Sequence, residues 1–267
     1  ILESLIKKDY INRGNNPTIY FPTARTGYLL TYKTLAGNAV QEKFSADVKS
    51  ENYLTKPNVD FLSALSRISV QNQSTRYKAV VNFIEKHVIG GQLKVSDLPA
   101  KDIMYVPEGQ SKMLPMYVTS GVVTEMTPLL LFLQYKDVAA MLMEEPEISL
   151  HPQLQIEIAR TLIRLVNSGM PVFVTTHSDI IIQHMNNMIK LSETAEKEKL
   201  LEKLDYEETD LLCRENIKVY QFEVQKNHKT LVECLPCGEY GFEAMTFYNT
   251  LKKLNEQIDL IEGMGEE

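Results

Sequence analysis

Two short uncharged runs, separated by a helical pattern, stand out in the middle of the chain. The first run spans Val138 to Met143 between charged neighbours, and the second, Pro171 to Thr176, is rich in β-branched residues. Each run fits a strand that is buried on both faces of a parallel sheet. Apolar residues recur at helical spacing from Ile156 to Val166. The pattern therefore predicts strand, helix and strand within an α/β fold.

The two predicted strands end in polar residues. Glu144 and Glu145 follow the first strand, and His177 follows the second. Strands joined by a helical crossover run parallel, so their carboxyl ends lie at one edge of the sheet, where α/β proteins bind ligands. We expect these three side chains to share one site. Pro146 prevents further ladder pairing, and Pro152 suits the first position of the intervening helix.

Three motifs around these strand ends resemble those of ABC-type ATPases that are not transporters, in the branch of the overcoming-lysogenization-defect (OLD) family and anti-phage ATPase subunits. They are EEPE at 144–147, LHP at 150–152 and TTHS at 175–178. The resemblance implies an ABC-type ATPase core with a parallel sheet, a helical insertion lobe and a C-terminal α+β cap. It also implies ATP and Mg²⁺ as ligands, with Glu145 as general base, Glu144 as a Mg²⁺ ligand through water and His177 on the γ-phosphate.

The segment from Leu114 to Gly121 resembles a degenerate ABC signature that opens a helix. The resemblance implies that Ser120 and Gly121 contact the γ-phosphate of ATP bound to a second subunit. A helix N-terminus presents unpaired N–H groups to such an anion. Two heads would then pair head to tail, as a homodimer or a higher homo-oligomer. Val122 and Val123 depart from the glycine and polar residue that are common in transporters.

A phosphate-binding loop is missing from the sequence. No Gly-Lys dipeptide occurs, so no GxxxxGK[ST] motif is present. Such a loop cradles the phosphates and supplies a Ser/Thr ligand for Mg²⁺. The sequence opens at Ile1 inside a charged, helix-like run. We expect that an N-terminal lobe with this loop is not included. The alternative is a degenerate ATPase without hydrolysis.

The sequence suggests three regions: 1–95 with a helical insertion lobe, 96–190 as the ATPase core, and 191–267 as the cap. The first region contains a strand pattern at 18–21, a loop at 22–27, helical patterns at 59–68 and 77–88, and a Gly-Gly helix stop at 90–91. A β-hairpin pattern pairs 102–106 with 112–118 ahead of the signature.

Arg25 lies in the predicted loop FPTARTG, at a point where the resembled branch also has an arginine after a strand and proline. A guanidinium group suits phosphate and carboxylate partners. Arg25 could therefore sense nucleotide or bridge lobes. The simpler interpretation is a structural ion pair with a carboxylate of the core.

Two further groups near the motifs have competing interpretations. His151 could be taken for a metal ligand, although helix-entry packing or an interface with a second subunit fits its position better. Ser178 and Asp179 could suggest a nucleophile beside His177, but they fit a helix N-cap better. A hydrolase would also need a nucleophile turn, which the sequence does not contain.

The C-terminal region combines an acidic stretch with a hairpin pattern. Residues 191–210 hold eight Asp or Glu against three Lys, which fits a solvated helical hairpin, with repulsion of nucleic acid or docking of a basic partner as the alternative. Strand patterns at 217–224 and 230–235 predict a hairpin, and 238–253 has helical spacing. Cys213, Cys234, Cys237 and His228 could form a zinc site, or the cysteines simply end the hairpin.

Composition limits the class of protein. The chain has 267 residues, of which 44% are hydrophobic and 24% charged, with three cysteines. Its uncharged runs, Met126 to Tyr135 among them, are all shorter than the roughly 20 residues of a membrane span, and no signal pattern opens the chain. We expect a cytoplasmic protein without a membrane partner. With a net charge of −7, nucleic-acid binding would need a local basic patch, a segment not included in the sequence, or a partner.

The sequence supports three hypotheses for function. The first is an ATPase that switches a defence-type assembly through a separately encoded effector, as in PARIS- or Septu-like systems, because residues 178–267 contain no Asp-x-Asp motif of a fused TOPRIM nuclease. The second is an ATPase of DNA repair or maintenance, which would favour long coiled-coil arms. The third is a nucleotide-gated scaffold without turnover.

Overall fold

The computed structural model describes residues 17–31, 54–71, 73–96, 102–225, 228–243 and 245–263. The chain divides into two compact units, Ile1–His177 and Ser178–Glu267. The division expected from the sequence, at 95 and 190, stays a prediction.

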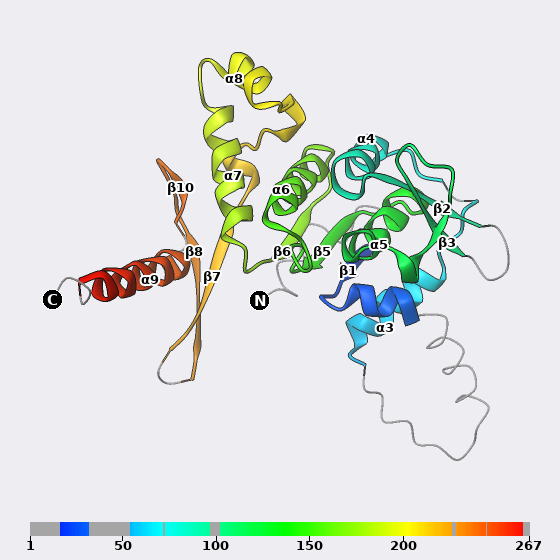
Figure 1. Ribbon diagram of the computed structural model, residues 1–267, viewed down its shortest axis with the longest axis horizontal. Helices are drawn as coiled ribbons and strands as arrows, with labels where there is room; N and C mark the ends of the chain where they lie inside the picture. Colours follow the sequence, from blue (N-terminus) through cyan, green and yellow to red (C-terminus); the bar gives the residue numbers. More distant parts are fainter. Residues whose placement is uncertain are drawn as a thin grey trace. The chain divides into compact units, whose positions relative to one another are not determined.

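A three-stranded parallel sheet forms the centre of the first unit (Figure 1). Its strands lie in the order β1 (Thr18–Phe21), β5 (Ala140–Glu144) and β6 (Val172–Thr175). In the register, Phe21 stands opposite Met143, and Glu144 opposite Thr175. The α/β class with a parallel sheet is confirmed. The central strand is deeply buried, as its uncharged sequence predicted.

Helices surround this sheet in sequence order. They are a turn of helix at 25–31, α3 (Lys56–Ser66), α4 (Lys78–Phe83), the π-helix η1 (Ile84–Ile89), α5 (Gly121–Tyr135) and α6 (Pro152–Asn167). Pro152 is the first residue of α6, as predicted. The predicted loop at 22–27 is shorter than expected, because helix begins at Arg25.

Aromatic rings pack β1 against two of these helices. Phe21 of β1 meets Phe132 of α5 edge to face, with ring centroids 5.4 Å apart, and Phe61 of α3 lies 6.0 Å from Phe21. All three side chains are buried. Such offset or edge-to-face pairs add to the free energy gained by burial. The loop that follows β1 therefore begins at a residue that is packed in the core.

The second sheet of this unit differs from the hairpin predicted from the sequence. β3 (Ile103–Pro107) pairs with β4 (Leu114–Pro115) for only two residues, and the chain then enters the 3₁₀ helix η2 (Met116–Val118). Pro115 has no N–H group with which to extend the ladder. On its other side, β3 pairs with β2 (Gly91–Val95), a strand that the sequence analysis missed.

Gly90 and Gly91 were predicted only as a helix stop. Gly90 does end η1 in the left-handed conformation, with φ of 59°. Gly91 has a different role, because a Cβ there would collide with the carbonyl oxygen of Val106 on the neighbouring strand. The second glycine is thus required for close pairing of β2 with β3.

The second unit contains helices and a long hairpin. In chain order its elements are α7 (Asp179–Ser192), α8 (Lys197–Leu204), η3 (Glu208–Asp210), η4 (Arg214–Asn216), β7 (Val219–Val224), β8 (Thr230–Leu235), β9 (Cys237–Gly238), β10 (Gly241–Phe242) and α9 (Met245–Gly263). The predicted β7–β8 hairpin is confirmed. Ser178 caps α7 by accepting a hydrogen bond from the Ile181 backbone N–H at 3.2 Å, which confirms the predicted N-cap.

The side chain of Asn186 joins α7 to β10 within the second unit. Its amide donates to the Phe242 carbonyl at 3.0 Å, and its oxygen accepts from the Phe242 N–H at 2.9 Å. The Asn186 side chain on α7 thus makes the pair of backbone hydrogen bonds that a neighbouring strand would otherwise make with β10. Gly241 allows this approach, because a Cβ at its position would collide with Asn186.

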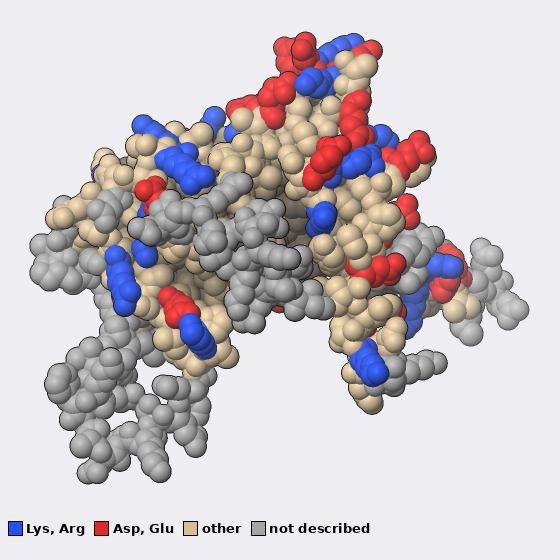
Figure 2. Space-filling model, turned by 180° about the vertical axis from the view of Figure 1, so that it is seen from behind, with Lys and Arg blue, Asp and Glu red and all other residues tan. Residues whose placement is uncertain are grey.

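Charges of both signs mix on the surface around α8. Lys and Arg side chains lie among Asp and Glu side chains over this element, at the top of Figure 2. Lys197, for example, lies 3.3 Å from Glu208. The negative charge of residues 191–210 is thus partly neutralised by nearby lysine side chains. No helix within the described ranges is long and apolar enough to cross a membrane.

A half-buried carboxylate in η1 yields a pH-dependent prediction. Glu85 accepts a hydrogen bond from Gln134 at 3.2 Å, and burial raises its pKa while the hydrogen bonds partly offset the rise. A pKa raised by folding means that stability falls as the pH rises through that pKa. We expect Glu85→Gln to raise the melting temperature at about pH 7, and the gain to disappear near pH 4, around the ordinary pKa of glutamate.

Thermal melts of both proteins over that pH range check this expectation. A gain that does not change with pH would show that Glu85 ionisation is not its cause.

Candidate functional site

The carboxyl ends of the three parallel strands bring polar residues to one edge of the sheet. Thr23 follows β1, Glu144 and Glu145 lie at the end of β5, and His177 follows β6. This topology places Glu144, Glu145 and His177 at the same edge of the sheet, and that their side chains share one site stays a prediction.

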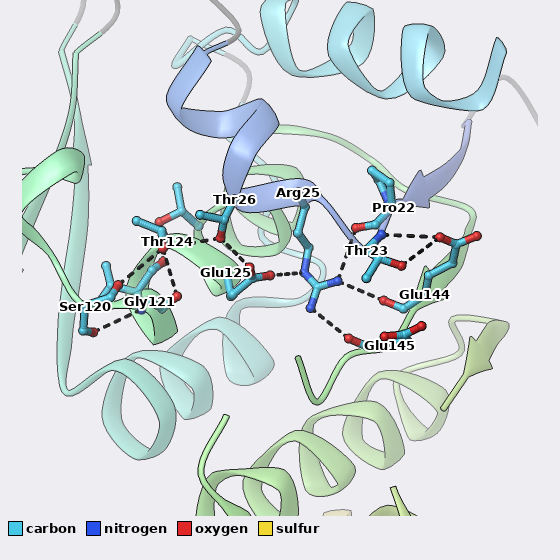
Figure 3. Close-up of polar contacts among 12 residues, drawn as sticks. Pro22, Thr23, Arg25, Thr26, Ser120, Gly121, Thr124, Glu125, Glu144 and Glu145 are labelled. Atoms are coloured by element: carbon cyan, nitrogen blue, oxygen red, sulfur yellow. Dashed lines mark hydrogen bonds and ion pairs between the residues drawn. The ribbon is translucent and has the colours of Figure 1, made fainter. Parts of the chain in front are cut away.

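Arg25 is at the centre of this edge and is completely buried, with 0% of its surface exposed. Its guanidinium group donates to the Glu144 carbonyl at 2.9 Å, to the Glu145 carbonyl at 3.1 Å and to the Pro22 carbonyl at 3.3 Å. Figure 3 shows the side chain reaching from the helix after β1 to the end of β5. The arginine therefore holds the backbone that carries both carboxylates.

The Nε atom of Arg25 faces a buried carboxylate of α5. Its Nε lies 2.8 Å from Glu125 Oε2, and the Glu125 side chain is 6% exposed. Burial lowers the pKa of Arg25, which Glu125 counteracts, and the group stays protonated because arginine titrates far above neutral pH. Burial also raises the pKa of Glu125, whereas Arg25 and the Thr26 hydroxyl lower it. The structural ion pair predicted for Arg25 is confirmed.

Glu144 has its carboxylate oriented by the loop after β1. Its Oε2 accepts from the Thr23 hydroxyl at 3.0 Å and from the Thr23 backbone N–H at 3.4 Å (Figure 3). Burial, together with the neighbouring Glu144 carboxylate, raises the pKa of Tyr20 on the adjacent strand. The Tyr20 hydroxyl therefore stays protonated beside this carboxylate.

Glu145 has an unusual backbone conformation. Its φ is 42°, in the left-handed region that residues other than glycine rarely adopt. The N–H of Glu145 donates to the Thr175 carbonyl at 2.8 Å, and its own carbonyl accepts from Arg25 and from the Ile148 N–H at 3.1 Å. With both backbone groups held, the carboxylate stays 35% exposed. It can therefore meet a ligand at the sheet edge.

His177 has an open side chain on an anchored backbone. Its imidazole is 88% exposed, with Nε2 3.9 Å from Glu145 Oε1. Its backbone N–H donates to Glu147 Oε1 at 2.6 Å, and the same oxygen accepts from the Thr176 hydroxyl at 2.8 Å. Glu147 thus ties the turn after β5 to the end of β6. Glu147 is the last residue of the EEPE motif, and this role was not predicted from the sequence.

Ser120 and Gly121 lie at the N-terminus of α5, away from the two carboxylates. Figure 3 shows them on the far side of the Glu125–Arg25 pair. The Ser120 hydroxyl accepts from the Val123 N–H at 3.4 Å, so it caps the helix, and both residues are exposed. A Cβ on Gly121 would lie 3.8 Å from the Cβ of Ser149, in the turn after β5. Their surface remains open to another molecule.

His151 caps α6 and is not grouped with other metal-ligating side chains. Its Nδ1 accepts from the Gln153 N–H at 3.5 Å, which agrees with the predicted role at the helix entry. Among the described residues, no three His, Cys, Asp or Glu side chains gather into a metal-binding group.

The oxygen donors at this edge fit Mg²⁺ bound together with a phosphate ligand. Mg²⁺ usually keeps several waters and takes only one or two protein carboxylates when phosphates supply the other oxygens. Glu144 is a carboxylate held in place by Thr23, and Glu145 projects beside it. A full cage of protein ligands is not needed for such a site.

Comparison with known proteins relates the chain to nucleotide-dependent enzymes. A family model described as an AAA ATPase domain matches residues 34–182. A chain solved in work on ATP-driven dimerization and DNA-stimulated activation of SMC ATPases aligns with a TM-score of 0.42 and 13% identity, over 73% of this chain and 96% of that chain. This likeness is too distant to transfer any property. No curated protein matches the sequence.

The Arg25–Glu125 pair gives a prediction for stability. Arg25→Met leaves the Glu125 charge buried without its partner, so we expect a loss of about 3–5 kcal/mol in the free energy of unfolding. The double variant Arg25→Met/Glu125→Leu should recover part of that loss, because no buried charge remains. Recovery should stay incomplete, since three carbonyl groups lose their donor.

Denaturant unfolding of the two single variants and the double variant measures this coupling. Lys56→Met is the control, because it removes the exposed Lys56–Asp60 pair and should change little. If the loss in the free energy of unfolding of the double variant equals the sum of the two single-variant losses, Arg25 and Glu125 do not stabilise each other.

Proposed function

The chain belongs to the AAA ATPase domain family, and from this premise we propose that it binds ATP with Mg²⁺ and hydrolyses it at the carboxyl edge of the parallel sheet. The observation that carries the proposal is the arrangement at the end of β5. There, a buried arginine holds the backbone of two adjacent glutamates, and one of them projects its carboxylate beside an exposed histidine. Phosphoryl transfer depends mainly on such positioning and on charge stabilisation.

Glu145 is proposed as the general base that orients and deprotonates the attacking water. Its carboxylate is open enough to reach a bound water. Its backbone is fixed by Thr175, Arg25 and Ile148, so the carboxylate loses little freedom on binding. Positioning of a base in advance lowers the entropic part of the barrier.

Glu144 is proposed to hold Mg²⁺, through water. Hydrogen bonds from the Thr23 hydroxyl and backbone N–H to Oε2 fix the orientation of its carboxylate. When bound, the metal ion would neutralise negative charge that develops on the phosphate oxygens. Thr23 thereby becomes an orienting residue for the metal ligand.

His177 is proposed to contact the γ-phosphate. The imidazole is almost fully exposed and lies next to the Glu145 carboxylate. The hydrogen bond from its backbone N–H to Glu147 keeps the residue at the end of β6. A ring N–H donated to a phosphate oxygen would stabilise charge in the transition state.

Ser120 and Gly121 are proposed to complete the site of a second copy. They are exposed at the start of α5, where N–H groups and the helix dipole favour an anion. Glu125, one turn further along the same helix, contacts Arg25. Two heads in a head-to-tail pair would each supply this helix end to ATP held by the other.

The biological use is proposed as a switch. ATP-dependent pairing in the cytoplasm would change the state of an assembly or of a separately encoded effector protein, as in the defence ATPases that the motifs resemble. Use in DNA maintenance is the alternative enzyme function, and a nucleotide-gated scaffold without turnover is the alternative binding function.

Removal of the proposed base tests the chemistry. In the full-length protein, Glu145→Gln should lower turnover 10²–10⁴-fold, because general base assistance typically contributes that much. Nucleotide affinity should stay near that of the parent protein, and the ATP-bound pair should accumulate. Steady-state hydrolysis, nucleotide binding and light scattering with ATP measure the three outcomes.

Glu108→Gln is the matched control, since this glutamate is exposed at the turn after β3, and it should leave all three unchanged. Turnover by Glu145→Gln above about a third of the parent rate would remove this residue from the role of base. Absence of hydrolysis in the parent protein, with pairing intact, would favour the scaffold.

A further inference from the structure

The carboxylate of Glu147 contacts the end of β6 but takes no direct part in the proposed chemistry. Its Oε1 accepts hydrogen bonds from the His177 backbone N–H at 2.6 Å and from the Thr176 hydroxyl at 2.8 Å. Its Oε2 is buried and has no hydrogen-bond partner among the described residues. One oxygen of a single carboxylate therefore makes both bonds. Hydrogen bonds to an ionised carboxylate are stronger than those between neutral groups.

These contacts lie where the backbone pairing of β5 with β6 ends. The last pair in the register is Glu144 with Thr175, and the Glu145 N–H donates to the Thr175 carbonyl at 2.8 Å. Beyond this point the chain after β5 enters a turn, and the chain after β6 leaves the strand and approaches α7. The Glu147 carboxylate thus connects the two strand ends as far as His177, after the backbone ladder has stopped.

The turn that carries Glu147 is closed by backbone hydrogen bonds. The Ile148 N–H donates to the Glu145 carbonyl at 3.1 Å, and the Leu150 N–H donates to the Glu147 carbonyl at 3.0 Å. Glu145 and Ser149, on either side of Glu147, have left-handed φ values of 42° and 61°. Residues other than glycine adopt this conformation only where their surroundings impose it. Glu147 therefore projects from a constrained backbone and can support the residues that it binds.

The same turn lies close to the buried arginine of the site. Burial lowers the pKa of Arg25, and the negative charges of Glu125, Glu147 and Glu145 counteract this lowering, in that order. Arg25 holds the Glu145 carbonyl at 3.1 Å, whereas Glu147 holds the N–H of His177. The Glu145 carboxylate and the His177 imidazole, 3.9 Å apart, are thus carried by backbone segments that neighbouring charged side chains fix.

We propose that Glu147 is a positioning residue that sets the separation between the Glu145 carboxylate and the His177 imidazole. This inference rests on the proposed function, in which Glu145 activates water and His177 contacts the γ-phosphate. Glu147 acts through the backbone of His177 and takes no part itself in proton or phosphoryl transfer. Because a displacement of about 1 Å can cost about 10²-fold in rate, loss of this support slows hydrolysis.

Substitutions of Glu147 separate the reach of its side chain from its charge. Gln keeps the length and an oxygen that can accept both hydrogen bonds, whereas Asp keeps the charge but withdraws the carboxylate by one methylene. In the full-length protein, Glu147→Ala and Glu147→Asp should lower kcat at least about tenfold, and Glu147→Gln should stay within about threefold of the parent. Glu108→Ala, at the exposed turn after β3, is the control and should leave kcat unchanged. Thermal melts of each variant allow kcat to be expressed per folded molecule.

Two measurements that need no hydrolysis test the positioning directly. Hydrogen exchange at the His177 amide should be at least about tenfold faster in Glu147→Ala, because this N–H loses a charged acceptor. Binding of a non-hydrolysable ATP analogue should weaken about tenfold in the same variant, since the contact with the γ-phosphate is misplaced. Binding of ADP, which has no γ-phosphate, should stay nearly constant.

The outcomes distinguish this role from the proposed activity. An unchanged kcat in Glu147→Ala, or equal losses in Glu147→Gln and Glu147→Asp, would overturn the proposal. Unchanged exchange at His177, or equal weakening of the analogue and of ADP, would also overturn it. If the parent protein does not hydrolyse ATP, the proposed turnover fails, and the exchange and binding measurements alone decide whether Glu147 positions His177.

Discussion

The buried guanidinium group of Arg25 is the interaction on which the candidate site depends. Its rigid fork contacts the loop after β1, the last residues of β5 and helix α5 at once. A buried cation is costly unless charge and hydrogen bonds compensate it. Here Glu125 supplies the opposite charge, and three carbonyl groups accept hydrogen bonds from the guanidinium. The loop after β1, the end of β5 and helix α5 therefore keep their positions at the site only while all three contact Arg25.

The fixed backbone explains how two adjacent glutamates take different orientations. Along a regular strand, neighbouring side chains point to opposite faces. Glu144 ends the strand and turns to Thr23, whereas Glu145 leaves it in a left-handed conformation and opens toward His177. A non-glycine residue at positive φ costs of order 1–3 kcal/mol and persists only where the surroundings impose it. Arg25 and Thr175 supply that constraint.

The sequence predicted those parts of the fold whose signal is local. The strands β1, β5 and β6 are uncharged runs with clear ends, α6 begins at a proline, and the β7–β8 hairpin alternates around a polar turn. Strand ends also predicted that Glu144, Glu145 and His177 would lie at one edge of the sheet. Strand β2 was missed because its first residue, Gly91, was interpreted only as a helix stop.

The supporting residues of the site depend on distant partners and could not be assigned in the same way. Glu125 is one polar residue in an apolar helix, and only the folded chain shows that it faces Arg25. The role of Glu147 likewise requires the pairing of β5 with β6, which brings Thr176 and His177 within reach. The signals in the sequence that could have identified them are a carboxylate in an apolar helix and a third glutamate after a strand.

The most direct measurement compares ATP turnover of Arg25→Lys with that of the parent protein, per folded molecule. Lysine keeps the charge beside Glu125, but its single ammonium group cannot bridge Glu125 and both carbonyl groups of β5. If Arg25 positions Glu145, kcat should fall at least about tenfold while KM for ATP stays nearly constant, as expected when a group acts through transition-state geometry. An unchanged kcat in a stably folded Arg25→Lys protein would contradict the account.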